Sequence, residues 1–500
     1  MRRQARVLSE PRRPSVETGL PSFSDAALMR LSACFAGTVS VAGAPGYNDA
    51  RMGFMHTYQS FPQIIGFCVC ESDVVALLDF ARDTGLRVVA RSGGHSTAGF
   101  SVNDQLVVDT SGINHVLIDH AARRARIGAG ANFRKLNLML DGTGLHLPGG
   151  GCETVCVAGY MQGGGYGFTS RLFGMNCDLV EAVTMVLADG TVVRACAENR
   201  PDLFWAVRGG TGCQFGILTE IEYRLVELDK IWGFGLRFPL SCRAEVDIAS
   251  RVLRDLQDGY TDGGAPDIGM QALLINVPTA QDPAAQTPAL LIRGLCNGSE
   301  THTRAALGPL LAHITDEAGQ IEIWQQGRYL ELNEMLLQTA NPPGMDLPTV
   351  SMNTKPLVDC RIIAHHHGPE RWRDVILHFL SAPDKTSFIA LECYGGAVNA
   401  QMPDAMAFVH RTDSLDLFAW SFWTFEETEP AATEWLDGFA RIAESMGTGR
   451  RYQNYPRRGA PNFAEAYFGT NLPRLVEIKR RHDPTGLFDY EQSLLRRAAT

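Results

Sequence analysis

The sequence predicts an α+β protein built from two domains. Its 500 residues exceed the size of one ordinary hydrophobic core. Residues 24–228 alternate short apolar runs with glycine-rich turns, whereas residues 229–449 carry longer apolar runs separated by amphipathic stretches. The second pattern is typical of an antiparallel sheet that helices cover on one face, with the other face open to a ligand.

The composition is that of a soluble globular protein. A formal net charge of −10 argues against a nucleic-acid partner, because phosphate binding needs a basic surface. The basic residues 1–23 contain no apolar core, so we expect a disordered tail there and no signal peptide. We expect no membrane association, since Arg30 interrupts the first apolar run, 26–36. Twelve cysteines without paired spacing favour a reduced, cytoplasmic location.

A strand–helix–strand unit is predicted near the start of the first domain. The apolar run 64–70 suits a buried strand, and the helix that follows has Ser72 as its N-cap and Gly85 at its C-terminal end. A second strand, 87–90, leads directly into a glycine-rich turn at 91–96. No G-x-G-x-x-G motif opens the helix, so the unit differs from a Rossmann dinucleotide fold.

The other predicted elements follow from hydrophobic periodicity and from turn residues such as Asp189-Gly190. In the first domain they are strands at 106–109 and 125–127, a helix at 131–141, a hairpin of 180–187 and 191–195, a short helix from 202 and a strand at 217–225. In the second domain they are strands at 232–238, 270–277, 290–295, 388–394 and 417–425, with helices at 245–256 and 371–380.

Two glycine-rich turns each carry one nucleophilic side chain. His95 lies in Arg91-Ser92-Gly93-Gly94-His95-Ser96, and Cys152 lies in Gly150-Gly151-Cys152-Glu153-Thr154-Val155. Such turns leave backbone N–H groups uncovered, and these groups can hold a pyrophosphate. The pair of turns therefore indicates a dinucleotide cofactor held at close range.

These turns belong to a series of motifs that resembles the berberine bridge enzyme-like FAD-linked oxidases, members of the vanillyl-alcohol-oxidase superfamily with a PCMH-type FAD-binding fold. The series has the same order as in that family. After the two turns it comprises Gly163-Gly164-Gly165-Tyr166-Gly167, Leu203-Phe204-Trp205-Ala206-Val207-Arg208-Gly209-Gly210, Tyr452-Gln453-Asn454-Tyr455, Tyr467-Phe468-Gly469-Thr470-Asn471 and Asp483-Pro484-Thr485-Gly486-Leu487-Phe488.

The resemblance implies a two-part FAD-binding domain, 24–228, a substrate domain, 229–449, and a C-terminal segment, 450–500, that returns to the FAD domain. It implies bicovalent FAD, with His95 and Cys152 both bonded to the isoalloxazine. Two such bonds should raise the reduction potential and permit an open cleft for a bulky substrate. The remaining cofactor contacts that it implies are Arg91, Ser92, Gly93, Gly94, Ser96, Gly151, Val155, Gly159, Tyr160, Gly164, Gly165, Gly167, Ile217 and Asn454.

Two residues depart from the family pattern. Cys156 stands where the family usually has glycine, and we interpret it as a small packing residue. Tyr160 stands where relatives often have histidine beside the flavin, a change expected to alter how the reduced flavin is stabilised.

The resemblance implies that Tyr455 removes the proton of a substrate hydroxyl while hydride passes from the same carbon to the flavin. An ordinary phenol, with a pKa near 10, is a poor base, so a nearby cation or hydrogen-bond donor is needed to lower that pKa. Tyr166 and Tyr394 are expected to support it. Molecular oxygen would then reoxidise the flavin to give hydrogen peroxide, and Val155 would leave it a route to the ring.

The expected substrate is a small molecule: a sugar, a glycoside or a natural-product alcohol of secondary metabolism. On the strand 388–394 alternate side chains share a face. Ala390, Glu392 and Tyr394 would face the cleft, with Glu392 and Tyr394 as substrate contacts, and Ile389, Leu391 and Cys393 would pack on helices. Alternatively, Glu392 pairs with Arg411.

Other functions stay open at this point. The alternatives are a flavin dehydrogenase with another electron acceptor and a non-redox cyclase or lyase with FAD as a structural template. A metal site is not expected, because the consecutive residues His365, His366 and His367 would alternate faces on a strand.

Overall fold

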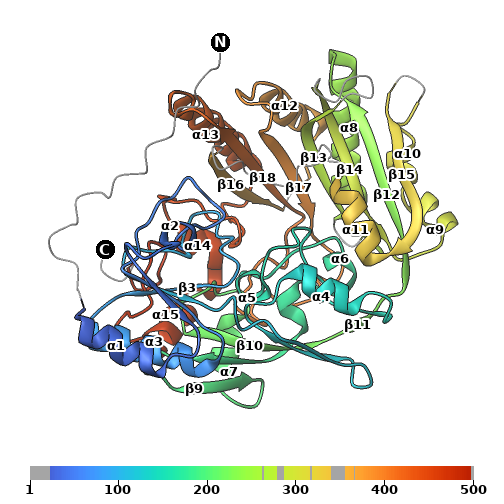
Figure 1. Cartoon of the computed structure of the whole chain (residues 1–500). Coiled ribbons are helices and arrows are strands. Elements are labelled where there is room, and N and C mark those ends of the chain that lie inside the picture. The colour runs from blue at the N-terminus through green and yellow to red at the C-terminus, as the bar shows by residue number, and fades with distance from the viewer. Residues whose placement is uncertain are drawn as a thin grey trace, which may run out of the picture.

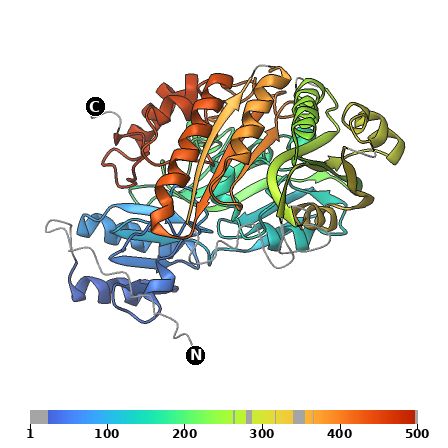
Figure 2. The ribbon, with the colours of Figure 1, turned by 90° about the horizontal axis from the view of Figure 1, so that it is seen from above.

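The computed structural model describes residues 23–496 except 262–263, 279–285, 316–317, 339–354 and 365. The described residues form sheets of four, five, two and seven strands together with helices, so the predicted α+β class is confirmed. Figure 1 shows the seven-stranded sheet above the smaller sheets, and Figure 2 shows the same layers from above. Apart from Phe23, the predicted tail lies outside the described residues.

The four-stranded sheet carries the first glycine-rich turn. Its order is β1-β2-β4-β3, with β2 and β3 both parallel to β4. Its elements are α1 (Asp25–Cys34), β1 (Thr38–Val41), α2 (Tyr47–Ala50), β2 (Ile64–Phe67), α3 (Glu71–Thr84), β3 (Val88–Arg91) and β4 (Leu106–Asp109). The predicted strand–helix–strand unit is therefore present, and the turn begins where β3 ends.

The N-cap of α3 is Cys70, so the prediction of Ser72 was wrong. The reason is Asp73 in the first turn, whose carboxylate accepts the backbone N–H of Val69 at 2.9 Å and that of Ala36 at 2.7 Å. A side chain inside the helix thus satisfies the donors ahead of it. The C-terminal prediction is confirmed, because Gly85 has a left-handed φ of 72°.

The five-stranded sheet, β5-β6-β10-β8-β9, is antiparallel throughout. The predicted hairpin at Asp189-Gly190 is confirmed as β8–β9. The strands are β5 (Val116–Asp119), β6 (Arg124–Gly128), β8 (Val180–Val186), β9 (Val192–Cys196) and β10 (Ile217–Arg224); β7 (Leu145–His146) pairs separately with β11 (Val226–Glu227). The helices are α4 (Phe133–Leu140), α5 (Val157–Gln162), α6 (Ser170–Phe173), the 3-10 turn η1 (Asn176–Leu179) and α7 (Pro201–Val207).

The seven-stranded sheet, β15-β12-β14-β13-β17-β18-β16, is also antiparallel. Its strands are β12 (Lys230–Pro239), β13 (Ile268–Pro278), β14 (Gln286–Cys296), β15 (Gln320–Arg328), β16 (Lys355–Ile363), β17 (Phe388–Cys393) and β18 (Leu415–Trp423). The other elements here are α8 (Arg243–Tyr260), α9 (Glu300–Ala306), α10 (Gly308–Leu311), α11 (Tyr329–Gln338), α12 (Pro369–Leu380), η2 (Glu426–Thr428) and α13 (Glu429–Met446).

One face of this sheet packs on helices, as predicted. Trp372 and Phe379 of α12 and Trp435 of α13 form a buried cluster with strand residues that include Ile389 and Leu391. The opposite face belongs to the core shared with the first domain, which contains Leu273, Phe388 and Phe418. The two faces of the sheet therefore differ in role. One face packs on helices and stabilises the domain, and the other is turned toward the first domain.

The chain after residue 450 contacts the N-terminal half. It contains α14 (Phe463–Phe468), η3 (Gly469–Asn471) and α15 (Leu472–His482). Beyond α15, Phe488 forms a parallel bridge with Val88 at the free edge of β3. The buried ammonium of Lys479 donates to Asp483 at 2.7 Å and to the Phe488 carbonyl at 3.0 Å, and this holds the bridge in place.

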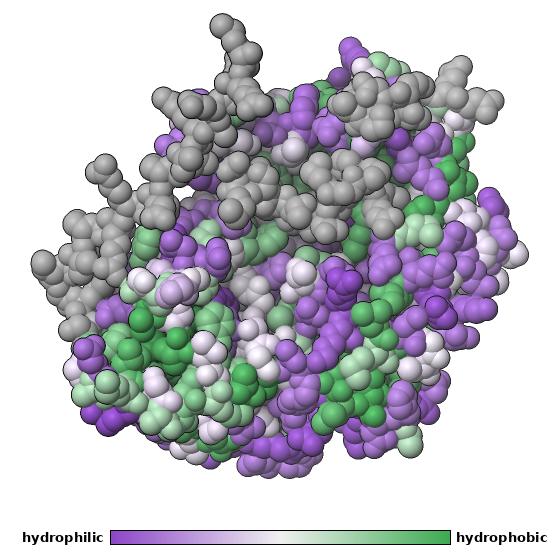
Figure 3. Space-filling model, viewed as in Figure 1, coloured by the Kyte–Doolittle hydropathy of each residue, from purple (hydrophilic) through white to green (hydrophobic). Residues whose placement is uncertain are grey.

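On the surface, large exposed hydrophobic side chains are spread over several elements, such as Met29 on α1, Leu377 on α12 and Phe425 after β18. Figure 3 shows small hydrophobic patches separated by hydrophilic residues on the face in view. Of the helices in the described ranges, none is both long and apolar enough to cross a membrane.

We predict that Asp483→Ala lowers the free energy of unfolding by about 3–5 kcal/mol, because it leaves the buried Lys479 ammonium without its partner. Thermal unfolding followed by circular dichroism measures the change. Asp489→Ala removes only an exposed ion pair with Arg496 and is the matched control, with an expected effect below about 1 kcal/mol. Equal melting temperatures for the two variants would contradict the prediction.

Candidate active site

A cavity of about 1320 Å³ lies between the glycine-rich turns and the open face of the seven-stranded sheet. Ordinary small-molecule pockets measure roughly 300–1,000 Å³. The larger volume leaves room for a dinucleotide together with a substrate. The walls come from all parts of the fold: the two turns, strands β13, β14, β17 and β18, helix α11, and the C-terminal segment around Tyr455.

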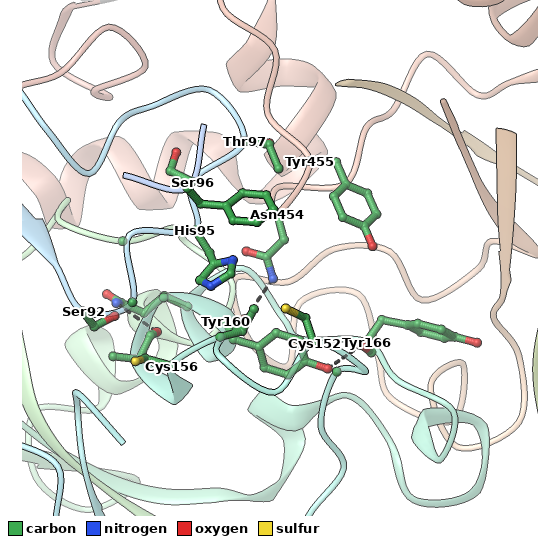
Figure 4. A pocket seen from close by; sticks show the side chains of 18 of the residues that line it. Ser92, His95, Ser96, Thr97, Cys152, Cys156, Tyr160, Tyr166, Asn454 and Tyr455 are labelled. Carbon is green, nitrogen blue, oxygen red and sulfur yellow. Dashed lines mark hydrogen bonds between the residues drawn. The ribbon is translucent and has the colours of Figure 1, made fainter. Parts of the chain in front are cut away.

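His95 and Cys152 enter this cavity from different turns (Figure 4). Both side chains contact the hydroxyl group of Thr154. Thr154 Oγ1 lies 3.0 Å from His95 Nε2 and 3.5 Å from Cys152 Sγ. The imidazole also stacks on Phe54, with ring centroids 4.6 Å apart. Burial lowers the pKa of His95 to about 4, so the ring is neutral at pH 7 and keeps a nucleophilic nitrogen.

The first turn is held in place by charge and by close packing. Arg91 at the end of β3 forms an ion pair with Asp109, its register partner on β4. A Cβ atom added to Gly93 would lie 3.1 Å from both the backbone nitrogen and the sulfur of Cys156. Cys156 itself is buried and donates its thiol to the Gly130 carbonyl at 3.3 Å, which fits the packing role predicted for it.

Most of the predicted cofactor contacts line the cavity: Arg91, Ser92, Gly93, Gly94, His95, Ser96, Gly151, Cys152, Val155, Gly159, Tyr160, Gly167, Ile217 and Asn454. Gly164 and Gly165 do not, and we correct that part of the prediction. Their φ angles of 106° and 83° form the turn itself, and the Gly165 N–H donates to the Tyr452 hydroxyl at 3.0 Å. A Cβ atom on Gly164 would collide with the Phe408 ring at 2.6 Å.

Tyr160, at the position where relatives often have histidine, uses its hydroxyl internally. The hydroxyl donates to the Tyr166 carbonyl, and the Tyr160 carbonyl accepts from Asn454 Nδ2 at 2.9 Å (Figure 4). Burial raises the pKa of Tyr160 well above its ordinary value. The phenol therefore stays neutral and ties the second and third turns to the C-terminal segment.

Tyr455 reaches the cavity from the C-terminal segment and donates its hydroxyl to Glu392 Oε1 at 3.0 Å. Burial and the Glu392 carboxylate raise the pKa of Tyr455 well above 10. The cation or donor that the sequence argument required to lower this pKa does not contact Tyr455 in the described structure. Its partner is instead a proton acceptor, and burial raises the pKa of Glu392 to about 8.

Tyr166 and Tyr394 stack with ring centroids 5.4 Å apart. The Tyr166 hydroxyl donates to the carbonyls of Cys393 at 2.8 Å and Met270 at 3.3 Å, so it braces the sheet. Tyr394 is fully buried and does not line the cavity, so its predicted substrate contact was wrong. Tyr394 lies on the predicted face, in one cluster with Phe388 and Ala390, but Tyr166, which lines the cavity, stacks on its ring.

The face assignment on β17 was otherwise correct for Glu392. Ile389, Leu391 and Cys393 lie in the helix-side cluster, whereas Phe388 and Glu392 line the cavity. The alternative partner, Arg411, forms an ion pair with Asp178 and is not available to Glu392. Glu392 therefore faces the space where a substrate would bind.

Sequence reasoning missed two polar residues on the cavity wall, Gln271 of β13 and Arg293 of β14. Both interrupt apolar strand runs that otherwise predict a buried sheet. A single polar side chain inside such a run was the signal, since a buried polar group needs a partner or a ligand.

The histidine run lies away from the cavity. His366 Nδ1 pairs with Asp258 at 2.6 Å, and His367 Nε2 bonds the Met446 carbonyl at 3.0 Å; His365 is outside the described residues. Across the residues described, no group of three metal-ligating side chains comes together.

Comparison with known proteins points to one family. A model of an FAD binding domain matches residues 62–195, and a model described as berberine and berberine like matches residues 451–494. The uncharacterized FAD-linked oxidoreductase YgaK of Bacillus subtilis is 28% identical over 466 residues, which cover 92% of this chain and 96% of that protein. Xylooligosaccharide oxidase of Thermothelomyces thermophilus is 27% identical over 437 residues, 83% of each chain.

Solved structures share the fold along the chain. A berberine bridge enzyme-like protein of Physcomitrella patens matches with a TM-score of 0.82 at 24% identity, covering 94% of this chain and 98% of that one. Glucooligosaccharide oxidase of Acremonium strictum matches with a TM-score of 0.80 at 22% identity, covering 93% and 98%.

The chain contains an FAD binding domain and a berberine-like C-terminal segment, and along most of its length it is similar to FAD-linked oxidoreductases. It is an enzyme, and its cofactor is FAD. The residues present fit that cofactor. Gly93 lets the cofactor approach the backbone at a place where a side chain would meet Cys156. The neutral His95 and Cys152 share one hydroxyl partner. The cavity is also larger than a small substrate alone would need.

We predict that Gly93→Ala reduces the FAD content of the purified protein. The added methyl group meets backbone atoms of Thr154 and Cys156 at 3.1–3.2 Å, so the turn must shift, at a cost of about 1–3 kcal/mol. The ratio of flavin to protein absorbance reports the loss. Gly259→Ala on α8, where an added Cβ meets nothing within 4 Å, is the matched control. Full FAD content in Gly93→Ala would show that the turn has room for a side chain.

Proposed function

We propose that this enzyme is an oxidase that takes hydride from a hydroxyl-bearing carbon of a sugar, glycoside or natural-product alcohol and passes the electrons to oxygen. The Tyr455–Glu392 pair carries the proposal, because it places a proton acceptor in the same cavity as His95 and Cys152. The names of two relatives, xylooligosaccharide oxidase and glucooligosaccharide oxidase, support a hydroxyl substrate and an oxidase reaction.

We propose further that FAD is attached through both His95 and Cys152. The glucooligosaccharide oxidase structure is described as containing 6-S-cysteinyl, 8α-N1-histidyl FAD. In this chain Thr154 engages Nε2 of His95, which leaves Nδ1 for the cofactor. The same Thr154 hydroxyl lies beside the Cys152 sulfur, so it orients both nucleophiles toward one ring.

Bound FAD supplies the hydride acceptor and the route by which two electrons reach molecular oxygen, which leaves as hydrogen peroxide. The protein residues handle the proton. The substrate hydroxyl gives its proton to the Tyr455 oxygen, and Tyr455 passes its own proton to Glu392 Oε1. Loss of that proton, together with loss of the carbon-bound hydrogen and its electron pair, leaves a carbonyl group. Tyr455 needs no low pKa in this relay, because Glu392 is the final acceptor.

Attachment is tested by mass and absorption of denatured protein. Wild type should keep a yellow chromophore and the mass of one FAD. His95→Ala and Cys152→Ala should each retain flavin through the remaining bond, and the double variant should release it. Release of all FAD from denatured wild type would disprove covalent attachment. The control is Cys156→Ala, which removes a buried thiol that packs behind Gly93 and should leave the FAD attached.

The proton relay is tested by rapid-mixing measurement of flavin reduction. Tyr455→Phe should retain FAD and reduce the rate by about 10²–10⁴ fold. Because only ionised Glu392 accepts a proton, the wild-type rate should rise as pH increases through about 8. Glu392→Gln should be slow and should lose this rise.

The control for the relay is Tyr394→Phe, which removes a buried hydroxyl outside the cavity and should leave the pH profile unchanged. Near wild-type reduction in Tyr455→Phe would remove Tyr455 from the mechanism. Admission of air after anaerobic reduction separates an oxidase, which reoxidises within seconds and forms peroxide, from a dehydrogenase.

A further inference from the structure

A row of polar side chains crosses the cavity face of the seven-stranded sheet. Arg293 on β14 is the register partner of Gln271 on β13, Gln271 is the partner of Glu392 on β17, and Glu392 is the partner of Asp416 on β18. Partners in an antiparallel pair point to the same side of the sheet. The rest of this face is mainly apolar, as in Leu273, Phe388, Phe418 and Trp420.

Arg293 stands at one end of the row and is 3% exposed. Its Nε and Nη2 donate to Gln271 Oε1 at 3.2 and 2.8 Å, and Nη1 donates to the carbonyls of Leu336 at 2.7 Å and Leu337 at 3.4 Å. A guanidinium has five N–H donors, so these four bonds leave one N–H on Nη2 for another acceptor. The three acceptor atoms are all neutral.

The charge of Arg293 is not neutralised by its surroundings. Burial lowers its pKa to about 9, which still leaves it protonated at pH 7. No carboxylate in the described ranges forms an ion pair with it. Burial raises the pKa of Glu392 to about 8, so this acid is mostly neutral at pH 7, and burial also raises the pKa of Asp416 well above its ordinary value. Glu334, on the cavity wall nearby, is exposed to solvent.

The row therefore presents one positive charge to the cavity at neutral pH. A buried ion without a counter-ion is unfavourable, and an anionic ligand removes that cost on binding. Guanidinium groups also bind carboxylates through strong, charge-assisted hydrogen bonds.

We propose that Arg293 binds an anionic group of the substrate, so that the enzyme oxidises a hydroxyl compound that carries a carboxylate, such as an acidic sugar or its glycoside. This inference rests on the proposed alcohol oxidation at Tyr455. Arg293 and Glu392 are two strands apart, and strands lie 4.7–4.9 Å apart, so the backbones are separated by about 10 Å. The carboxylate must then lie at the far end of the substrate from the oxidised carbon.

Arg293 also has a structural task, which the experiment must separate from substrate binding. Its bonds to Leu336 and Leu337 fasten the last turn of α11, where the helix dipole favours a cation. A purely structural arginine would affect charged and neutral substrates alike. Only an anion-binding arginine changes the ratio between them.

The test compares cellobiouronic acid with cellobiose in the holoenzyme. The two disaccharides differ only in the carboxylate that replaces the CH₂OH group at the end remote from the reducing-end hydroxyl. Peroxide formation gives kcat/KM for each, and the change in flavin absorption on titration gives each Kd. We expect wild type to favour the acid by about 10–100-fold, a ratio typical of one hydrogen bond to a charged group.

Arg293→Gln should bring this ratio close to one, and Arg293→Lys should keep part of it. Arg237→Gln is the matched control, because Arg237 lies on β12 of the same sheet but pairs with Glu322 outside the cavity. It should leave the ratio unchanged. Melting temperatures of all variants show how much of any change in activity comes from losing the hydrogen bonds between Arg293 and the end of α11.

Two results would overturn the inference: a wild type that does not favour the acid, or an Arg293→Gln variant that weakens both sugars equally. In either case peroxide formed from cellobiose would leave the proposed oxidase function standing. If neither sugar yields peroxide, the proposal that the enzyme oxidises such sugars is wrong. The titration still tests the inference in that case. Tighter binding of the acid that depends on Arg293 supports the inference, and equal binding of the two sugars refutes it.

Discussion

The hydroxyl of Tyr452 is the point on which the site depends. It accepts the backbone N–H groups of Gly165 and Tyr166 at 3.0 and 3.1 Å, and Asn454 Nδ2 at 3.1 Å. Tyr452 is almost fully buried, so each of these donors would be costly to leave unsatisfied. One oxygen thus joins the third glycine-rich turn to the C-terminal segment. Tyr455, three residues further along, is held above the cavity by the same junction.

The cavity combines two electrostatic environments. Around the glycine-rich turns the charged groups are paired, as Arg91 is with Asp109, and the nucleophile His95 is neutral. On the sheet side, burial raises the pKa values of Glu392 and Asp416, which disfavours their charged forms, and Arg293 stays protonated at pH 7. The first environment suits a cofactor that brings its own phosphates to backbone donors, and the second distinguishes substrates by charge.

Local signals in the sequence predicted the elements well, and the spaced motifs predicted the cofactor side of the cavity. The hairpin at Asp189-Gly190 and the end of α3 at Gly85 needed only turn chemistry. The errors came from contacts made across the chain. Asp73, bonded to Ala36, moved the start of α3, and Tyr166, which lines the cavity, stacks on Tyr394 and covers its ring.

The polar row could not be derived from the sequence. Gln271, Arg293 and Glu392 are separated in the sequence by up to 121 residues, and only the register of the folded sheet aligns them. Likewise, the choice between Arg411 and the cleft for Glu392 depended on Asp178, which lies in another domain of the predicted organisation. Pairings between distant residues leave no periodic pattern in the sequence from which they could be predicted.

The bridge between Val88 and Phe488 has a consequence for how the enzyme is made. The strand that delivers His95 obtains its outer neighbour from nearly the last described residues, so the ribosome must synthesise almost the entire chain before that strand is covered. A nascent or prematurely terminated polypeptide contains His95 and Cys152 but lacks the C-terminal segment that carries Tyr455. The cavity is therefore completed only late in synthesis, when the residues around Tyr455 and Phe488 have joined the glycine-rich turns.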